Sequence, residues 1–158
     1  APPSPPERRG FSYPPVAGKL ACMKARCQCG QLRTEIPEDA ASLGARVMCH
    51  CKACQRRTGS PFGMMVYFPR DAVTLSGEAT EYTRIADSGN ELTHGFCPTC
   101  GTPFWLTTSK HPGGIGIASG AFDGSDAGPP HRSVFEENRH DWIVVPETAE
   151  RLPRGRNG

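Results

Sequence analysis

The chain has 158 residues, a formal net charge of +2 and 37% hydrophobic residues. This length suits one domain, and the near balance of charge gives no sign of a nucleic-acid-binding surface. The sequence holds no apolar run near the roughly 18 residues of a membrane span and no signal-peptide-like segment, so we expect a cytoplasmic protein without membrane partners.

The two ends of the sequence differ in composition from the part between them. Residues 1–15 contain six prolines, which predicts a disordered or extended tail. Residues 154–158 predict a short polar tail. We therefore place the folded domain at residues 16–153.

Between the tails, apolar residues recur with a period of two, which is typical of β-strands. In residues 31–36, for example, Leu32, Thr34 and Ile36 alternate with polar neighbours. Similar patterns predict strands at 46–49, 61–68, 72–75, 79–85, 91–96, 103–107, 114–119, 133–136 and 142–145. Only 52–57 resembles a helical turn, and Thr58-Gly59 ends it. With 18 glycines and 16 prolines, the chain is expected to form an all-β domain of small antiparallel sheets with very little helix.

Eight cysteines are the unusual feature of the composition, and seven of them form three tight clusters. The clusters are Cys27 and Cys29; Cys49, Cys51 and Cys54; and Cys97 and Cys100. Cysteines one or two residues apart are placed to converge on one ion, so this spacing favours metal binding over disulfides. Zinc suits such thiolate sites, whereas seven clustered thiolates do not divide into two four-cysteine iron–sulfur sites.

The clusters divide into a closed site and an open one. Cys27, Cys29, Cys97 and Cys100 provide four ligands, the number that closes a structural zinc site. Cys49, Cys51 and Cys54 provide three, which leaves one position open. Cys22 or His50 could fill that position, but His50 lies between two ligands and points away in an extended segment. Cys22 is interpreted as a buried thiol.

Three motifs, in this order, resemble the glutathione-dependent formaldehyde-activating enzyme family, which includes centromere protein V. They are Cys27-Gln-Cys-Gly30, Cys49-His-Cys-Lys-Ala-Cys54 followed by Gly59-Ser-Pro-Phe62, and Phe96-Cys-Pro-Thr-Cys-Gly-Thr102. The similarity extends from about Lys19 to Pro153. It implies a zinc-pinned β-tent fold with two zinc ions per chain. It also implies a structural zinc on the four-cysteine set and a catalytic zinc on Cys49, Cys51 and Cys54, the latter held less tightly and only partly occupied.

The resemblance implies a carbon–sulfur lyase that adds glutathione to formaldehyde, giving S-hydroxymethylglutathione. Lys52, Arg56 and Arg57 are candidate anchors for the carboxylates of glutathione. They could equally offset thiolate charge. Candidates for protonating the product oxygen are His50, Thr58 and Tyr67. His94-Gly95 stands where family members often carry arginine.

Two other classes of function remain open from the residues alone. One is a non-catalytic zinc module that binds glutathione, a protein or nucleic acid, for which Lys24, Arg26, Lys52, Arg56 and Arg57 would have to form one patch. Nucleic acid is the least expected partner, because aromatic residues do not interleave with these cations. The other is a redox or metal-storage role, which the abundant thiols suggest and the strand pattern disfavours.

Overall fold

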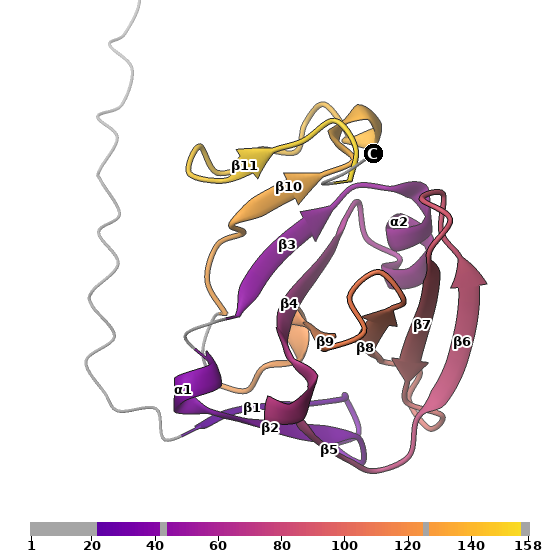
Figure 1. Ribbon diagram of the computed structural model, residues 1–158, viewed down its shortest axis with the longest axis vertical. Helices are drawn as coiled ribbons and strands as arrows, with labels where there is room; N and C mark the ends of the chain where they lie inside the picture. Colours follow the sequence, from indigo (N-terminus) through magenta and orange to yellow (C-terminus); the bar gives the residue numbers. More distant parts are fainter. Residues whose placement is uncertain (1–21, 42–43, 125–126, 156–158) are drawn as a thin grey trace, which may run out of the picture.

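The computed structural model describes residues 22–41, 44–124 and 127–155 (Figure 1). The predicted tail at 1–15 and residues 156–158 of the predicted C-terminal tail lie outside the described residues. The described chain is mostly β-structure, arranged as one sheet of three strands and one of eight. No helix in it is long and apolar enough to cross a membrane.

The three-stranded sheet has the order β1-β2-β5 and is antiparallel throughout. Its strands are β1 (Cys22–Arg26), β2 (Arg33–Pro37) and β5 (Thr74–Ser76). In β2, Thr34 and Ile36 are buried and their neighbours are exposed, as the alternation predicts. β1 was not predicted, because only Ala25 of its five residues is fully buried and the apolar pattern is weak.

The eight-stranded sheet has the order β11-β10-β3-β4-β9-β8-β7-β6. Its strands are β3 (Ala45–Cys49), β4 (Gly63–Pro69), β6 (Thr80–Ile85), β7 (Glu91–Phe96), β8 (Pro103–Thr108), β9 (Gly114–Ala118), β10 (Arg132–Val134) and β11 (Glu150–Arg151). The expectation of antiparallel pairing fails at one place: β10 runs parallel to both β3 and β11. The chain crosses from β9 to the far side of β3 before β10 begins, and β10 runs in the same direction as β9 and β3.

Helical structure is short, as the composition predicts. α1 (Glu38–Ala41) follows β2, and α2 (Lys52–Thr58) connects β3 to β4. The 3₁₀ turns are η1 (Arg70–Ala72), η2 (Ser119–Ala121) and η3 (Glu136–Asn138). The helical turn predicted at 52–57 corresponds to α2.

The strand predicted at 142–145 is not present. Ile143 and Val145 are buried and Trp142 and Val144 are exposed, so the alternation in burial is real. The segment nevertheless pairs with no other strand: the Ile143 amide bonds back to the His140 carbonyl, and the Ile143 carbonyl accepts a bond from the Arg139 guanidinium. Burial alternates here because an extended segment covers one face of a small core.

Two apolar clusters make up the core of the described part of the chain. The larger joins residues of both sheets, among them Ile36, Phe68, Phe104 and Ile117. The smaller contains Met48, Ile143, Val145 and Ala149, and it fixes the C-terminal segment against β3. The two cysteine clusters described next lie at the ends of strands that this packing positions.

Candidate metal centres and the adjoining cavity

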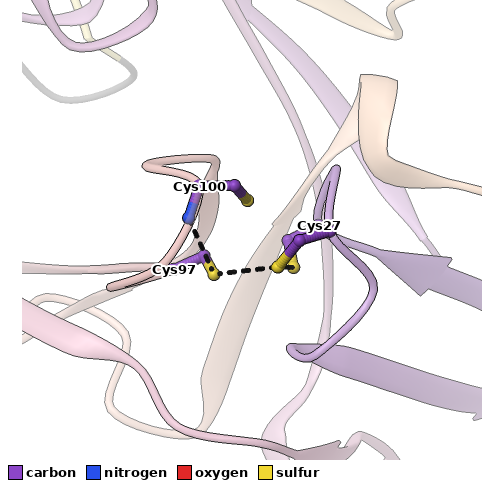
Figure 2. Close-up of side chains that lie close together, drawn as sticks. Cys27, Cys97 and Cys100 are labelled. Atoms are coloured by element: carbon purple, nitrogen blue, oxygen red, sulfur yellow. Dashed lines mark hydrogen bonds between the residues drawn. The ribbon is translucent and has the colours of Figure 1, made fainter.

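Four cysteines from two distant segments converge on one point. Cys27 and Cys29 follow β1, and Cys97 and Cys100 follow β7; Figure 2 shows the two loops facing each other. Their sulfur atoms all lie within 4.8 Å of one another, with Cys27–Cys29 at 3.5 Å and Cys29–Cys97 at 3.6 Å. Tetrahedral zinc with Zn–S bonds of about 2.3 Å needs sulfurs about 3.8 Å apart, so the four-cysteine cluster fits this ion.

Hydrogen-bond donors surround these sulfurs. The Gln31 side-chain amide donates to Cys97 Sγ at 3.1 Å, and the Leu32 amide donates to Cys27 Sγ at 3.3 Å. The Thr102 hydroxyl lies 3.1 Å from Cys100 Sγ, and this contact is the first cause that lowers the pKa of Cys100 to about 5. Donors directed at sulfur stabilise thiolates, the form that binds metal.

The second cluster is local in sequence. Cys49 ends β3, Cys51 caps the N-terminus of α2, and Cys54 lies in the first turn of that helix. The Cys54 amide donates to Cys51 Sγ at 3.4 Å. Contacts from the thiols of Cys49 and Cys54 lower the pKa of Cys51, because two neighbours donate to one sulfur. The three sulfurs also lie within 4.8 Å of one another, so this cluster could hold a metal ion with three protein ligands.

Cys22 and His50 belong to neither cluster of the described residues. The spacing of the seven other cysteines predicts this grouping of four and three. Cys22 lies at the start of β1, remote in sequence and in sheet from Cys49.

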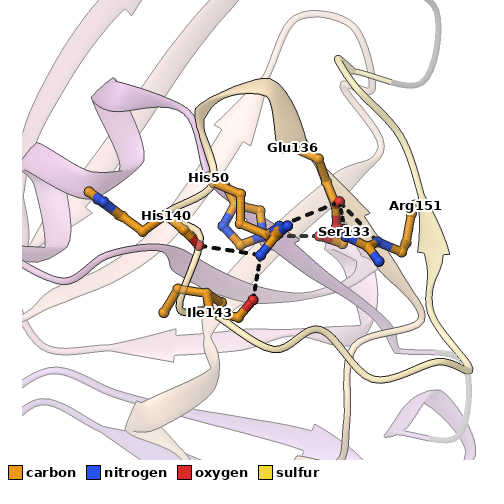
Figure 3. Close-up of polar contacts among 7 residues, drawn as sticks. His50, Ser133, Glu136, His140, Ile143 and Arg151 are labelled. Atoms are coloured by element: carbon orange, nitrogen blue, oxygen red, sulfur yellow. Dashed lines mark hydrogen bonds and ion pairs between the residues drawn. The ribbon is translucent and has the colours of Figure 1, made fainter.

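The His50 side chain belongs to a buried polar network with residues of the C-terminal segment (Figure 3). His50 Nε2 lies 3.0 Å from Ser133 Oγ, and Ser133 Oγ donates to Glu136 Oε1 at 2.6 Å. His50 and Ser133 are both 0% exposed. Burial raises the pKa of Glu136, but hydrogen bonds from Arg151 and Ser133 outweigh it and leave the pKa below its usual range. The network joins the loop that carries Cys49 and Cys51 to the C-terminal segment.

A cavity of about 780 Å³ adjoins the three-cysteine cluster through Cys51. It is lined by residues of α2, of the strands β6, β7 and β8, and of the turn η3. Lys52, Arg56 and Arg57, the predicted anchors, all line this cavity. Lys52 and Arg56 are exposed, whereas Arg57 is half-buried.

Three buried nitrogen atoms on side chains that line the cavity have no hydrogen-bond partner among the described residues. They are Nε and Nη2 of Arg57, and Nε2 of His94. Burial first, and then the charges of Arg57 and Arg84, lower the pKa of His94 to about 4. His94 is therefore neutral at pH 7, and Arg57 provides the buried positive charge.

Sequence reasoning missed much of the cavity wall. Arg84, Tyr82 and Trp105 come from strands far along the chain, and no local motif marks them. His50, Thr58 and Tyr67, the candidates for protonating the product oxygen, are not among the described residues that line the cavity. The Thr58 hydroxyl instead donates to the Cys54 carbonyl at 2.9 Å.

The basic residues do not form one patch. Lys24 and Arg26 line a separate, smaller cavity and pair there with Glu35 and Asp123.

Comparison with known proteins places this geometry in context. The sequence profile described as "Glutathione-dependent formaldehyde-activating enzyme" matches residues 22–138. A protein of Penicillium rubens that carries the same enzyme name, as a provisional assignment, is 28% identical over 99 residues. That alignment covers 62% of this chain and 51% of the relative, so this chain spans about half of the relative's length.

A crystal structure of a Rhodobacter sphaeroides protein has the same fold. Its TM-score is 0.50 at 22% identity, and the alignment covers 65% of this chain and 90% of that one.

Proposed function

Because the chain belongs to the glutathione-dependent formaldehyde-activating enzyme family, we propose that it adds a thiol, glutathione, to formaldehyde or a related small aldehyde. The product would be S-hydroxymethylglutathione. The observation that best supports this proposal is the position of the three-cysteine cluster, which meets a large cavity lined by cations.

The two cysteine clusters take different roles in this proposal. The four-cysteine cluster would hold a structural zinc with no open position. The three-cysteine cluster would hold a second zinc, which supplies an open position where an incoming thiol is bound and its pKa lowered. Cys51 places this second cluster at the cavity wall.

The chain's own residues then bind and orient the substrates. Lys52 and Arg56 are exposed cations at the cavity, suited to the two carboxylates of glutathione. Binding both substrates beside Cys51 brings sulfur and carbonyl carbon together, and this proximity accelerates addition. The sulfur–carbon bond forms, the carbonyl π pair moves to oxygen, and the proton released by the thiol ends on that oxygen by way of solvent.

Calorimetric titration of reduced glutathione into zinc-loaded protein tests the proposal. We expect binding with proton release, because the thiol must lose its proton to become a ligand. S-methylglutathione is the matched control: it keeps both carboxylates and cannot form a thiolate. Equal affinity for the two compounds, or no binding of glutathione, would contradict a thiol site.

A further inference from the structure

Arg57 presents an unsatisfied edge of its guanidinium inside the protein. The two atoms without partners, Nε and Nη2, form one edge of the planar guanidinium group. This is the edge that binds both oxygens of a carboxylate with two parallel hydrogen bonds. A buried charged group without partners is costly, so a ligand that supplies two oxygens would relieve it.

The position of this edge is fixed by a glycine. A Cβ atom on Gly63 would lie 2.7 Å from Arg57 Nη2, and the same Cβ would lie 3.6 Å from Cys54 Sγ. The guanidinium therefore occupies space beside the three-cysteine cluster that only glycine at position 63 leaves free. The electrostatic influence of Arg57 on Cys54, Tyr67 and His94 agrees with this placement.

Among the described residues, no carboxylate pairs with Arg57. Two acidic residues line the cavity, Asp87 and Glu137, and Glu137 pairs with Arg154 at 3.4 Å. His94, neutral and with an unpartnered Nε2, lines the same cavity. Its Nε2 and the Arg57 edge are covered by protein, so a ligand reaches them only when neighbouring side chains shift. These groups favour an anionic ligand of small size beside the cluster.

We propose that Arg57, with His94 beside it, is a receptor for the carboxylate of the aldehyde substrate, so that the preferred electrophile is a small 2-oxo acid such as glyoxylate. This inference rests on the proposed thiol-addition function and names its second substrate class. Glyoxylate carries its carboxylate on the carbon next to the carbonyl. Holding that carboxylate beside Cys54 places the carbonyl carbon where the sulfur of the thiol is bound.

The carboxylates of glutathione fit this receptor less well. Each is separated from the sulfur by several bonds, so a glutathione whose sulfur lies at the cluster extends away from it. Lys52 and Arg56, both exposed, are better placed for these remote groups. The cavity thus divides its cations between the two substrates.

The reaction remains a simple addition with this substrate. One sulfur–carbon bond forms, the carbonyl π pair becomes the new hydroxyl with the proton released by the thiol, and the carboxylate is unchanged. No oxidant or reductant is needed.

The first test measures carboxylate binding without any reaction. Oxamate, an unreactive analogue of glyoxylate with an amino group in place of the aldehyde hydrogen, is titrated into zinc-loaded protein and its binding followed by calorimetry. We expect Arg57→Gln and Arg57→Lys each to weaken oxamate binding roughly tenfold or more, because both remove the two-bond edge. If Arg57 only offsets thiolate charge, Arg57→Lys would bind oxamate as wild type does, and the proposal fails.

Two further variants control this test. Gly63→Ala displaces the end of a flexible side chain and should weaken oxamate binding while the protein stays folded. Arg26→Gln removes a cation that pairs with Asp123 outside the cavity and should leave oxamate binding unchanged. If Gly63→Ala and Arg57→Gln, as single variants, both bind oxamate as the wild type does, the proposal is overturned.

The second test compares glyoxylate with formaldehyde as partners of glutathione. We expect the enzyme to accelerate the reaction of glyoxylate more than that of formaldehyde, each relative to its uncatalysed rate. The Arg57 variants should lose the acceleration with glyoxylate while they keep their affinity for glutathione. If the Arg57 variants instead lose affinity for glutathione, Arg57 binds the thiol substrate and the inference is overturned. Oxamate binding that depends on Arg57, without acceleration of either aldehyde, would refute the proposed function while supporting the carboxylate receptor.

Discussion

Cys54 is held in place by α2 rather than by the cluster alone. The Thr58 hydroxyl bonds to the Cys54 carbonyl, and the Gly59 amide bonds to the Gln55 carbonyl in a left-handed cap with φ of 65°. The C-terminal end of the helix is therefore capped without any sulfur of the cluster. Changing one sulfur in its first turn should leave the local structure intact.

From this follows the first prediction, on Cys54→Ser. We expect the variant to bind one zinc instead of two and to lose catalysed addition, because a hydroxyl is a poor zinc ligand beside two thiolates. Metal content by mass spectrometry and the melting temperature check this. Cys22→Ser is the matched control, since Cys22 lies outside both clusters; a fully active Cys54→Ser would disprove the role of this cluster.

Gly95 makes a second close contact near the cavity. A Cβ atom there would lie 1.9 Å from the ring of Trp105, on the neighbouring strand. Gly95→Ala should lower the free energy of unfolding by about 1–3 kcal/mol, because the buried indole must move. Urea denaturation measures this change. At Gly120 a Cβ atom would have nothing within 4 Å, so Gly120→Ala should change stability by less than about 0.5 kcal/mol.

At the scale of elements, η3 connects the C-terminal segment to the loop that carries the three-cysteine cluster. Glu136, at the start of η3, accepts hydrogen bonds from Ser133 and Arg151, and Ser133 contacts His50. Gln55 of α2 adds a second connection, since its side-chain amide donates to the His50 carbonyl at 2.8 Å and to the Asn138 carbonyl at 3.2 Å. These contacts add to the pairing of β10 with β3 and β11, and they also connect η3 to α2.

The third prediction concerns Glu136 and pH. Its pKa in the folded protein is lowered, so its charged form stabilises the fold above its unfolded pKa of about 4.5. This stabilisation is lost as the pH falls through the folded value. Glu136→Gln should therefore destabilise the protein at pH 7 and much less at pH 3. Urea midpoints across this range test the prediction, with Glu137→Gln as the neighbouring control; a constant difference would contradict it.

Several elements could be predicted from the sequence. Residues 91–96 match β7 at both ends, and 103–107 and 114–119 match β8 and β9 within one residue, because period-two patterns flanked by turn residues depend on local chemistry. Burial alternation could not distinguish a paired strand from the unpaired segment at 142–145. Strand direction at β10 depended on a long crossing that no local pattern encodes.

The cysteine clusters could be predicted more fully than the cavity. Close spacing indicates which neighbouring sulfurs share an ion, and counting ligands joins the two distant pairs into one site of four. Arg84 and His94 reach the cavity only through the pairing of β6 with β7, and the buried edge of Arg57 depends on Gly63 in another strand. Such contacts are set by packing across strands rather than by spacing.

At the scale of the whole molecule, the four-cysteine cluster connects the two sheets. One pair of ligands follows β1 of the small sheet, and the other follows β7 of the large sheet. The Gln28 amide also bonds to the Thr102 hydroxyl at 3.1 Å across the same junction. A metal ion there would hold the sheets around the larger core.

The fourth prediction tests this connection. Cys29→Ala and Cys97→Ala should each destabilise the domain by several kcal/mol or unfold it, because metal binding and folding are coupled. A chelator should have the same effect on the wild-type protein. Circular dichroism and thermal melting measure both. Native spectra and an unchanged melting temperature in either variant would show that this cluster does not stabilise the fold.

The two clusters also differ in when they can be completed as the chain is made. Cys49, Cys51 and Cys54 lie within one short loop and helix, so their sulfurs can gather as soon as α2 forms. Cys27 and Cys29 must wait for Cys97 and Cys100, and closing that long loop has a larger entropic cost. During synthesis an ion would therefore meet the three-sulfur site first, although the four-sulfur site, with one ligand more, would hold metal more tightly once the chain is complete. The site that an ion meets first would therefore be the one that finally binds it less tightly.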